Sequence, residues 1–578
     1  MSVIAEEPIP DIWVLQELAS TSIMKRTLIL TLSFALFSAA TYAAVPQGAG
    51  PLPPPLAPTE NPITPEKAVL GKILFWEEQL SSDDTMACGT CHGVPAGFTD
   101  ARVGTHPGND EILGSPDDLF TSPGVIRAEL DGTYAPDPTF GLNVQLTGRR
   151  TPDIFGALYA AETFWDGRGT SSFTDPETGV LLIASGAALE SQAIGPILSD
   201  AEMAHEFRDW DAVTEKLQQV RPMALATDLT PDMVSALAIS PTYASLFRDA
   251  FGTTDITAQR IAYAIATYER TLFPNQSPWD EFQAGDQNAM TPNQVAGFNQ
   301  FNGPANCRNC HTPPFFTDNQ FHNLGLRPTT EDNGRQGVTG LFADRGKFKT
   351  PSLRNAGLRE RFFHNGQENV LNNGPAPGGV DSIYIAGGGP FADNRDPLLV
   401  PLAGRPGINM QQIMDFVANA LTDPRVANAL PPFDKPTLYS ERHPGGADRF
   451  GPSNPSGSGV TPRLITLTPG VLGSTSFKIG LQDAPTTSAI AVLGISRTMG
   501  SGTLVRGVPF NLGGPVAVWI PAPIQIDNAG LGYATFAFGI PNLASLTGID
   551  FFAQAFIQDS SAPGGSGAAT AGATYTMH

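Results

Sequence analysis

Cys88-Gly-Thr-Cys91-His92 and Cys307-Arg-Asn-Cys310-His311 are two copies of one pattern, Cys-x-x-Cys-His. The copies begin 219 residues apart, and together they use all four cysteines of the 578-residue sequence. No cysteine is left over for a disulfide outside the pattern. A zinc ion or a redox-active thiol pair is the alternative interpretation of each motif, but zinc would need four soft ligands gathered at one site.

The spacing suits covalent attachment of haem, because the two thiols add to the two vinyl groups while the adjacent histidine reaches the iron from one side. The repetition of the motif, with every cysteine used, favours haem over zinc or redox thiols. We therefore predict two attached haem c groups, each with a histidine as the proximal iron ligand. The predicted attachment residues and proximal ligands are Cys88, Cys91, His92, Cys307, Cys310 and His311.

Residues 1–44 are predicted to be a signal peptide region. Lys25 and Arg26 precede an apolar run at 27–40, and small residues follow it. The run is short for a membrane span, so an uncleaved anchor is the weaker interpretation. The residues before Met24 include four acidic side chains, which suit an export signal poorly, and we expect translation to start at Met24. The protein is thus predicted to be exported, to the periplasm or the cell surface.

The central part of the chain is predicted to be mainly α, with two cytochrome c-like haem domains in tandem. Thr64-Pro65 is a typical helix start, with a capping side chain and a proline at the first helical position. Residues 257–272 place apolar side chains at helical spacing. The predicted boundaries are a proline-rich linker at 45–63, a first haem domain at 64–285 and a second at 286–445.

The composition changes beyond a second predicted linker at 446–462, which is rich in Gly, Pro and Ser. Short β-branched or aromatic runs, such as 516–520 and 533–538, alternate with turn residues, which is typical of an all-β sandwich. We predict a separate sandwich-like domain at 463–578. Its only histidine is His578, so we expect no chemistry there; adhesion, sorting, partner docking and a passive structural role all stay open.

The charge is unevenly distributed. The net charge is −22, yet residues 461–578 hold four basic and four acidic residues, so the whole excess lies in residues 1–460. Such a field repels nucleic acid and would steer a basic protein partner toward the surface. A merely soluble acidic surface is the alternative for any single patch.

Segments around the two motifs resemble the bacterial di-haem cytochrome c peroxidase and MauG family over about residues 64–430. The resemblance rests on segments that follow one another in the family's order. They are Leu70-Gly-Lys-Ile-Leu-Phe75, Phe164-Trp165-Asp166-Gly167-Arg168, Gln192-Ala-Ile-Gly-Pro196, Glu202-Met203, Phe348-Lys-Thr-Pro-Ser-Leu-Arg-Asn355 and Phe362-Phe-His-Asn-Gly366. It does not reach the β-rich tail.

The resemblance implies roles for three further residues. The N-terminal haem would reduce peroxide, the C-terminal haem would store and deliver an electron, and Trp165 would relay the electron between them. Without the resemblance, a buried core tryptophan is an equally good interpretation. Gln192 and Glu202 match the family's distal polar pair, and a carboxylate beside the open iron face suits the proton transfer that peroxide cleavage needs.

Two departures from the family concern the distal iron ligands. An enlarged segment after the first motif offers His106 as a candidate ligand of the first iron, although its surroundings align poorly. Tyr384 fits the ligand segment of the second iron, where peroxidases generally have Met and MauG-type enzymes have Tyr. Met410 and Met414 follow a helical apolar pattern and are interpreted as core.

A third departure concerns calcium, which the resemblance implies between the two haem domains. Arg150 stands where an asparagine ligand is expected, and Arg359-Glu-Arg361 replaces the segment that would supply carbonyl oxygens. Backbone oxygens elsewhere could still serve. The sequence leaves one calcium ion open.

The leading functional hypothesis is a di-haem peroxidase that reduces hydrogen peroxide with electrons from a small cytochrome c or a cupredoxin. A homodimer is compatible with the resemblance. A MauG-like oxidase or oxygenase acting on a protein or organic substrate is the alternative, motivated by Tyr384. A non-catalytic electron carrier or haem sensor is a third, but Gln192 and Glu202 argue against it, because a carrier needs no acid–base group beside the iron.

Overall fold

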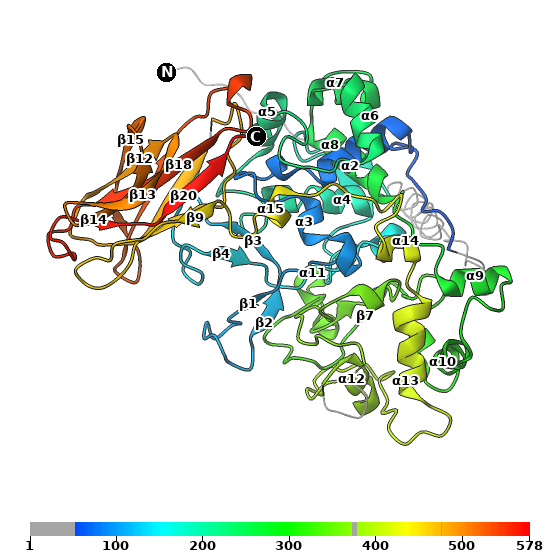
Figure 1. The fold of residues 1–578 in the computed structure, drawn as a ribbon. Coiled ribbons are helices and arrows are strands. Elements are labelled where there is room, and N and C mark those ends of the chain that lie inside the picture. The colour runs from blue at the N-terminus through cyan, green and yellow to red at the C-terminus, as the bar shows by residue number, and fades with distance from the viewer. Residues whose placement is uncertain (1–51, 373–377, 476) are drawn as a thin grey trace, which may run out of the picture. The chain divides into compact units, whose positions relative to one another are not determined.

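A computed structural model describes residues 52–372, 378–475 and 477–578 (Figure 1). The predicted signal region at 1–44, with its expected start at Met24, lies outside them. Within the described residues, no helix combines the length and the apolar character that crossing a membrane requires.

The proline-rich stretch that was expected to be a linker is packed against the helical part. Asn61 is fully buried, and its amide donates to Glu190 Oε1 (2.8 Å) and to the Tyr263 carbonyl (3.0 Å). Buried amide hydrogen bonds of this kind anchor a segment. The described part of the stretch, 52–63, therefore has no helix or strand but is anchored to the helical part at Asn61, and the linker at 45–63 stays a prediction.

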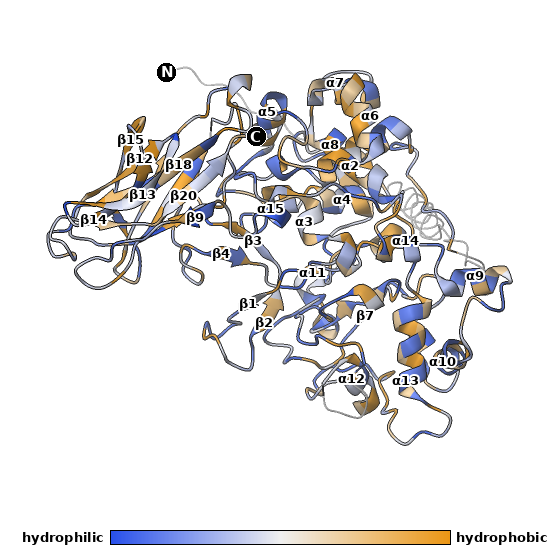
Figure 2. Cartoon of the chain, in the orientation of Figure 1, coloured by the Kyte–Doolittle hydropathy of each residue, from blue (hydrophilic) through white to orange (hydrophobic). Residues whose placement is uncertain are grey.

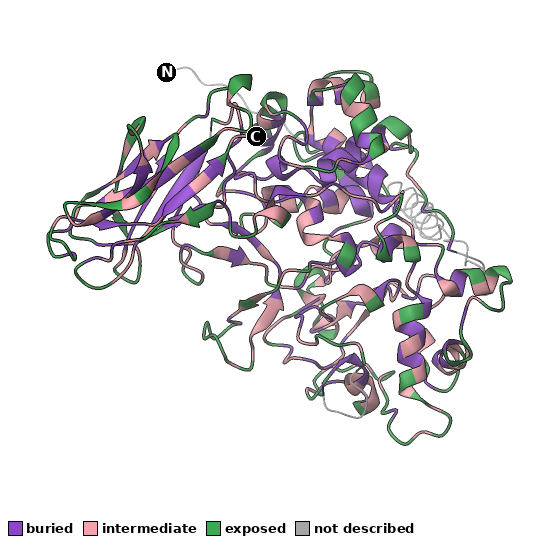
Figure 3. Ribbon diagram, in the orientation of Figure 1, coloured by how far each residue is buried: buried purple, intermediate pink, exposed green. Residues whose placement is uncertain are grey.

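Two helices far apart in the sequence form the centre of the helical part. They are α2 (Pro65–Phe75) and α8 (Ala258–Glu269), which pack against each other and are largely buried (Figure 3). The Thr64 side chain caps α2, as the sequence predicts. Gly71 permits the close approach, because a Cβ there would overlap the Ala264 carbonyl.

Some of the other helices lie around this pair, and others belong to the second half of the chain (Figure 1). They include α4 (Ala188–Ala193), α5 (Trp210–Gln219), α6 (Pro231–Ile239), α7 (Tyr243–Phe251), α9 (Pro278–Ala284), α10 (Pro292–Asn302), α12 (Val380–Ala386) and α13 (Met410–Asp415). Single turns include α3 (Cys88–Cys91), α11 (Gln336–Thr339), α14 (Pro424–Ala427), α15 (Tyr439–Arg442) and the 3₁₀ turn Cys307–Asn309. Each cysteine motif thus begins in a helical turn.

Between the first motif and Arg149 the chain forms short strand pairs. β1 (Gly104–His106) pairs with β2 (Leu119–Thr121), and β3 (Pro123–Ile126) pairs with β4 (Val144–Leu146), both antiparallel. β3, β4 and the loop between them make up the 123–146 segment. Other short pairs are β5 (Phe173–Thr174) with β6 (Leu181–Ile183) and β7 (Phe321–His322) with β8 (Phe348–Lys349).

The C-terminal part is β-rich, as predicted. A four-stranded antiparallel sheet has the order β10 (Arg463–Ile465), β11 (Lys478–Ala484), β17 (Gly532–Ala537) and β16 (Gln525–Ile526). A six-stranded sheet has the order β15 (Val518–Pro523), β12 (Ile490–Ser496), β18 (Asp550–Ile557), β20 (Gly572–Thr576) and β9 (Asp448–Phe450), with β19 (Ala568–Ala569) beside β18. β13 (Thr498–Val505) and β14 (Val508–Gly513) form a hairpin.

The two sheets enclose one apolar core, to which Leu481 of β11 and Leu493 of β12 both contribute. Hydrophobic residues recur along the strands (Figure 2). The linker predicted at 446–462 is corrected in part, because β9 is paired with β20 in register Asp448↔Thr574. Three residues of an apparently loop-like stretch therefore complete the edge of a sheet.

Candidate functional site

The first cysteine motif lines a cavity of about 550 Å³. Cys88, Cys91 and His92 lie on its wall, together with Phe75 of α2 and Ile265 of α8. The two central helices therefore form part of the cavity wall, although the cysteine motif belongs to neither helix.

The His92 imidazole is oriented by a backbone hydrogen bond. Its Nδ1 lies 3.1 Å from the carbonyl oxygen of Phe98. Because a carbonyl can only accept, Nδ1 carries the proton, and Nε2 keeps its lone pair for a metal. Burial lowers the pKa of His92, which favours the neutral ring that an iron ligand needs.

The second motif repeats this arrangement. The Nδ1 atom of His311 lies 3.1 Å from the Phe316 carbonyl, and burial lowers the pKa of His311 to about 4. His311, Cys307 and Cys310 line a second cavity. Two thiols, one neutral imidazole with a free Nε2 and a largely apolar wall are the donor set that haem c requires, so both sites fit this group.

Two residues predicted for a distal role lie in the first cavity. Gln192, at the end of α4, and Glu202 line it together with Ser199 and Arg168. The Ser199 hydroxyl and the Arg168 charge act on the Glu202 carboxyl and lower its pKa, but burial outweighs both, so the net shift is upward. A carboxyl whose pKa is raised binds a proton more readily than an exposed carboxyl does.

One buried carboxyl of the first cavity was missed by the sequence analysis. Glu269 of α8 is 4% exposed, and its Oε2 atom is buried without a hydrogen-bond partner. Burial raises the pKa of Glu269 to about 8. The signal was present, because Glu269 follows Ile261 and Ile265 at intervals of four residues and therefore occupies the apolar face of the helix.

Trp165 lines both cavities. Its indole Nε1 donates to the Arg150 carbonyl (2.7 Å), and its ring lies 6.3 Å from the His364 ring, centroid to centroid. Residues 150–153 and 349–351 also line both cavities. The tryptophan predicted from the sequence is thus held in place by a hydrogen bond between the two sites.

Tyr384, the predicted distal ligand of the second iron, shares one cavity with the two methionines that were interpreted as core from the sequence. Tyr384 of α12 lines it, and so do Met410 and Met414 of α13. Burial raises the pKa of Tyr384, and the nearby Cys307 and Cys310 thiols raise it further. The phenol therefore lines the same cavity as the haem-binding cysteines, and its role as an iron ligand stays a prediction.

His106, the candidate ligand of the first iron, is placed on β1. It is absent from the residues that line the first cavity, among those the structure describes. Its Nδ1 accepts the Gly108 N–H (3.1 Å), and its ring packs edge-on against Phe140. Among the described residues, His106 and His92 thus do not line the same cavity.

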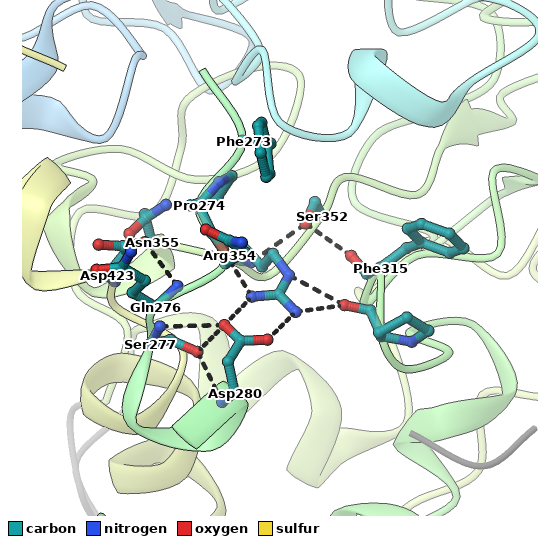
Figure 4. Close-up of polar contacts among 12 residues, drawn as sticks. Phe273, Pro274, Gln276, Ser277, Asp280, Phe315, Ser352, Arg354, Asn355 and Asp423 are labelled. Atoms are coloured by element: carbon teal, nitrogen blue, oxygen red, sulfur yellow. Dashed lines mark hydrogen bonds and ion pairs between the residues drawn. The ribbon is translucent and has the colours of Figure 1, made fainter. Parts of the chain in front are cut away.

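Arg354, within the Phe348–Asn355 motif, has a structural role (Figure 4). Its guanidinium pairs with both carboxylate oxygens of Asp280 on α9 (2.8 and 2.9 Å) and donates to the Pro314 carbonyl (2.8 Å). Pro314 lies three residues after His311, so this buried pair ties the second haem-binding loop to α9. Such a bidentate pair adds geometric specificity as well as attraction.

One further cation stands beside the second motif. The His322 ring nitrogens lie 2.9 Å from an Asp318 oxygen and 2.6 Å from an Asp396 oxygen. Hydrogen bonding raises the pKa of His322 to about 11, and the bond to Asp318 contributes more than the bond to the Cys310 sulfur. Cys310, Asp318 and His322 could in principle hold a metal. Haem attachment uses the Cys310 sulfur, so we assign this trio no separate ion.

The residues at the expected calcium position do not fit calcium. Arg150 is 2% exposed, and its guanidinium donates to the Arg102 carbonyl (2.7 Å) and to the Asp100 carbonyl. Arg359 pairs with Asp153 (3.1 Å) nearby. Guanidinium groups therefore stand at the expected position and use the nearby oxygens, and their charge would repel a divalent cation.

Two cysteine–histidine loops, each beside its own cavity and each with an oriented neutral imidazole, define a di-haem c-type protein. A sequence model of the family described as di-haem cytochrome c peroxidase matches residues 65–288. The chain is 31% identical over 333 residues to methylamine utilization protein MauG of Methylorubrum extorquens, covering 57% of this chain and 72% of that protein.

The cytochrome c551 peroxidase of Nitrosomonas europaea is 29% identical over 348 residues, covering 59% of this chain and 81% of that one. The crystal structure of a MauG-like protein associated with microbial copper homeostasis has a TM-score of 0.46 at 22% identity, covering 70% of this chain and 99% of its own. The chain belongs to the di-haem cytochrome c peroxidase family and is a peroxidase-type oxidoreductase.

Chelation is expected to leave the protein unchanged, because Arg150 already occupies the carbonyl oxygens of Asp100 and Arg102. Treatment of the holo-protein with EGTA should alter neither the haem absorption spectra nor the melting temperature, and elemental analysis should find well under one calcium per chain. A melting temperature that falls on chelation and recovers with calcium would contradict this expectation.

Proposed function

We propose that this protein is an exported di-haem peroxidase that reduces hydrogen peroxide to water. Electrons would come from a small cytochrome c or a cupredoxin through the His311 site, and peroxide would react at the His92 site. Bound haem supplies the two irons for this redox chemistry. The observation that carries the proposal is the presence of Glu202, Gln192 and His92 on one cavity, with Trp165 shared by both cavities.

Glu202 moves the proton in this proposal. Reduction of one hydrogen peroxide consumes two electrons and two protons and yields two waters. The Glu202 carboxylate takes a proton from one peroxide oxygen and returns it to the other, which then leaves as water. The Gln192 amide, on the same cavity, orients the peroxide, and Ser199 and Arg168 favour the charged carboxylate against the larger, opposing effect of burial on its pKa.

Trp165 carries the electron between the sites in this proposal. An indole ring gives up an electron more readily than aliphatic packing does. The hydrogen bond from Nε1 to the Arg150 carbonyl fixes the ring where both cavities meet. The relay therefore needs no large motion of the protein.

A MauG-like oxidase or oxygenase acting on a protein or organic substrate is the second candidate function. The observation that favours it is Tyr384 on the second cavity. A phenolate ligand would stabilise ferric iron and lower the reduction potential, whereas a thioether from Met410 or Met414 would raise it. The ligand of the second iron therefore separates the two functions.

We further propose two tandem cytochrome c-like domains, a peroxidatic one at 64–285 and an electron-transfer one at 286–445. The repeated imidazole-to-carbonyl geometry of His92 and His311 supports this division. The β-rich domain follows from Asp448 onward. Export to the periplasm or cell surface and assembly as a homodimer complete the proposal, and His106 and calcium have no part in it.

Glu202→Gln should slow peroxide reduction by about 10²-fold or more, because the amide cannot take a proton. The native rate should fall as the pH drops through the raised pKa of Glu202, since protonation removes the base, and this dependence should vanish in the variant. Stopped-flow mixing with peroxide measures both. Glu215→Gln, on the exposed face of α5, is the matched control; equal kinetics in the two variants would remove Glu202 from the mechanism.

Trp165→Phe should slow electron transfer between the two sites at least about tenfold, equivalent to ~1.4 kcal/mol in the barrier. The measurement is the oxidation of the second haem after peroxide is added to half-reduced protein. Trp210→Phe, a buried tryptophan of α5 absent from both described cavity linings, controls for the loss of an indole. Unchanged transfer in Trp165→Phe would exclude the relay.

Tyr384→Phe should raise the reduction potential of the second haem and change its low-temperature magnetic circular dichroism, because the ferric-stabilising phenolate is lost. Tyr439→Phe serves as the control, since Tyr439 lies outside the described cavity lining. A spectrum of the native protein typical of Met ligation would assign the iron to Met410 or Met414 and remove the main support for the MauG-like function.

A further inference from the structure

The loop that carries Glu202 is held from one side by the 123–146 segment. Gln145 Nε2 donates to the Asp200 carbonyl (2.8 Å). Gly124 touches the next peptide, because a Cβ there would overlap the Ala201 carbonyl oxygen. Three consecutive residues of the loop, 200–202, therefore lie against or directly beside this segment.

The far end of the same loop is anchored to the same segment. The Glu206 N–H donates to the Ala128 carbonyl (2.9 Å), and the Glu206 carboxylate pairs with Arg127 (2.6 Å). The other side of the loop is fixed from the helical core, where Arg208 donates to the Leu80 carbonyl (2.8 Å). The position of Glu202 thus depends on two supports, of which the 123–146 segment is one.

The 123–146 segment is in turn packed on the β-rich domain. Ile126, Tyr134 and Leu142 form a buried cluster with Ile465 of β10 and Tyr533 of β17. This cluster is separate from the apolar core between the two sheets.

Polar contacts reinforce this packing. The Tyr134 N–H donates to Thr535 Oγ1 (2.9 Å), and Lys478 Nζ donates to the Gly132 carbonyl (2.7 Å). The Lys478 ammonium also lies 4.4 Å from the centre of the Tyr134 ring. Lys478 is 5% exposed, so this cation is enclosed by the contact that it makes.

The alternation of side chains explains how one sheet makes both contacts. Along a strand, successive residues point to opposite faces. In β10, Leu464 enters the core between the sheets while Ile465 faces the 123–146 segment; in β17, Phe536 enters that core while Tyr533 faces the segment. The four-stranded sheet is therefore covered on both faces, one by its partner sheet and one by the segment.

We propose that the β-rich domain is part of the scaffold of the first haem site: its four-stranded sheet holds the 123–146 segment, and the segment positions the loop that carries Glu202. Ile465, Tyr134 and Lys478 are positioning residues in this arrangement, acting on Glu202 only through the segment. The catalytic consequence rests on the proposed role of Glu202, whereas the mechanical coupling does not.

A matched pair of variants in the full-length holo-protein tests the coupling. Ile465→Ala removes an aliphatic side chain that faces the segment, and Leu493→Ala removes one that faces only the core between the sheets. Both should lower the melting temperature by several degrees. Only Ile465→Ala should increase amide hydrogen exchange in peptides covering 199–206, measured by mass spectrometry.

Equal exchange at 199–206 in both variants would overturn the proposal. If Ile465→Ala fails to fold, Lys478→Met replaces it, because the aliphatic stem is kept and only the bond to the Gly132 carbonyl and the charge are lost. Protection of the loop that stays native in Lys478→Met would then overturn the proposal.

The peroxide reaction separates this inference from the proposed function. Ile465→Ala should slow the stopped-flow peroxide reaction about tenfold or more through displacement of Glu202, while Leu493→Ala leaves it native and both keep the native spectrum of the second haem. Faster exchange at 199–206 with an unchanged rate would confirm the coupling and count against the role of Glu202. A slowed rate with unchanged exchange would overturn the coupling alone.

Discussion

One hydrogen bond, made twice, underlies the chemistry of this protein: the imidazole Nδ1–H donates to a backbone carbonyl. In the first site the pair is His92 and Phe98, and in the second it is His311 and Phe316. Without such a bond a buried neutral imidazole could present either nitrogen to the cavity. The bond selects the tautomer and the ring orientation together, so each loop offers an Nε2 lone pair beside two thiols. The other parts of each site can serve an iron only if this Nε2 lone pair points into the cavity.

The first site also contains the carboxyl groups of Glu202 and Glu269, and burial disfavours the charged form of each. Glu202 has a hydroxyl and a guanidinium to support its carboxylate, whereas one oxygen of Glu269 has no partner. Burial raises the pKa of both groups, that of Glu269 to about 8, so both carboxyls bind a proton more readily than exposed ones do. Keeping an unpartnered carboxyl inside costs stability.

Much of the site could be predicted from the sequence because its residues belong to short sequence motifs. Attachment cysteines and proximal histidines are adjacent residues, and Gln192 and Glu202 stand ten apart in a segment similar to the family's. What the sequence analysis missed was buried or remote. Glu269 was not singled out, although it lies on the apolar face of its helix, and Asp448–Phe450 lay within a predicted linker until pairing with β20 made it an edge strand.

The sequence by itself determined the two haem loops, the helix that begins after Thr64 and the β-rich character of the tail, because each depends on residues close together in the chain. Only the tertiary structure decided that Trp165 lies on both cavities, that the Arg150 guanidinium occupies the carbonyl oxygens of Asp100 and Arg102, and that the β-rich domain supports the 123–146 segment. Those relations join residues from about 50 to 400 positions apart. Spacing along the chain does not specify such contacts; packing of complementary surfaces does.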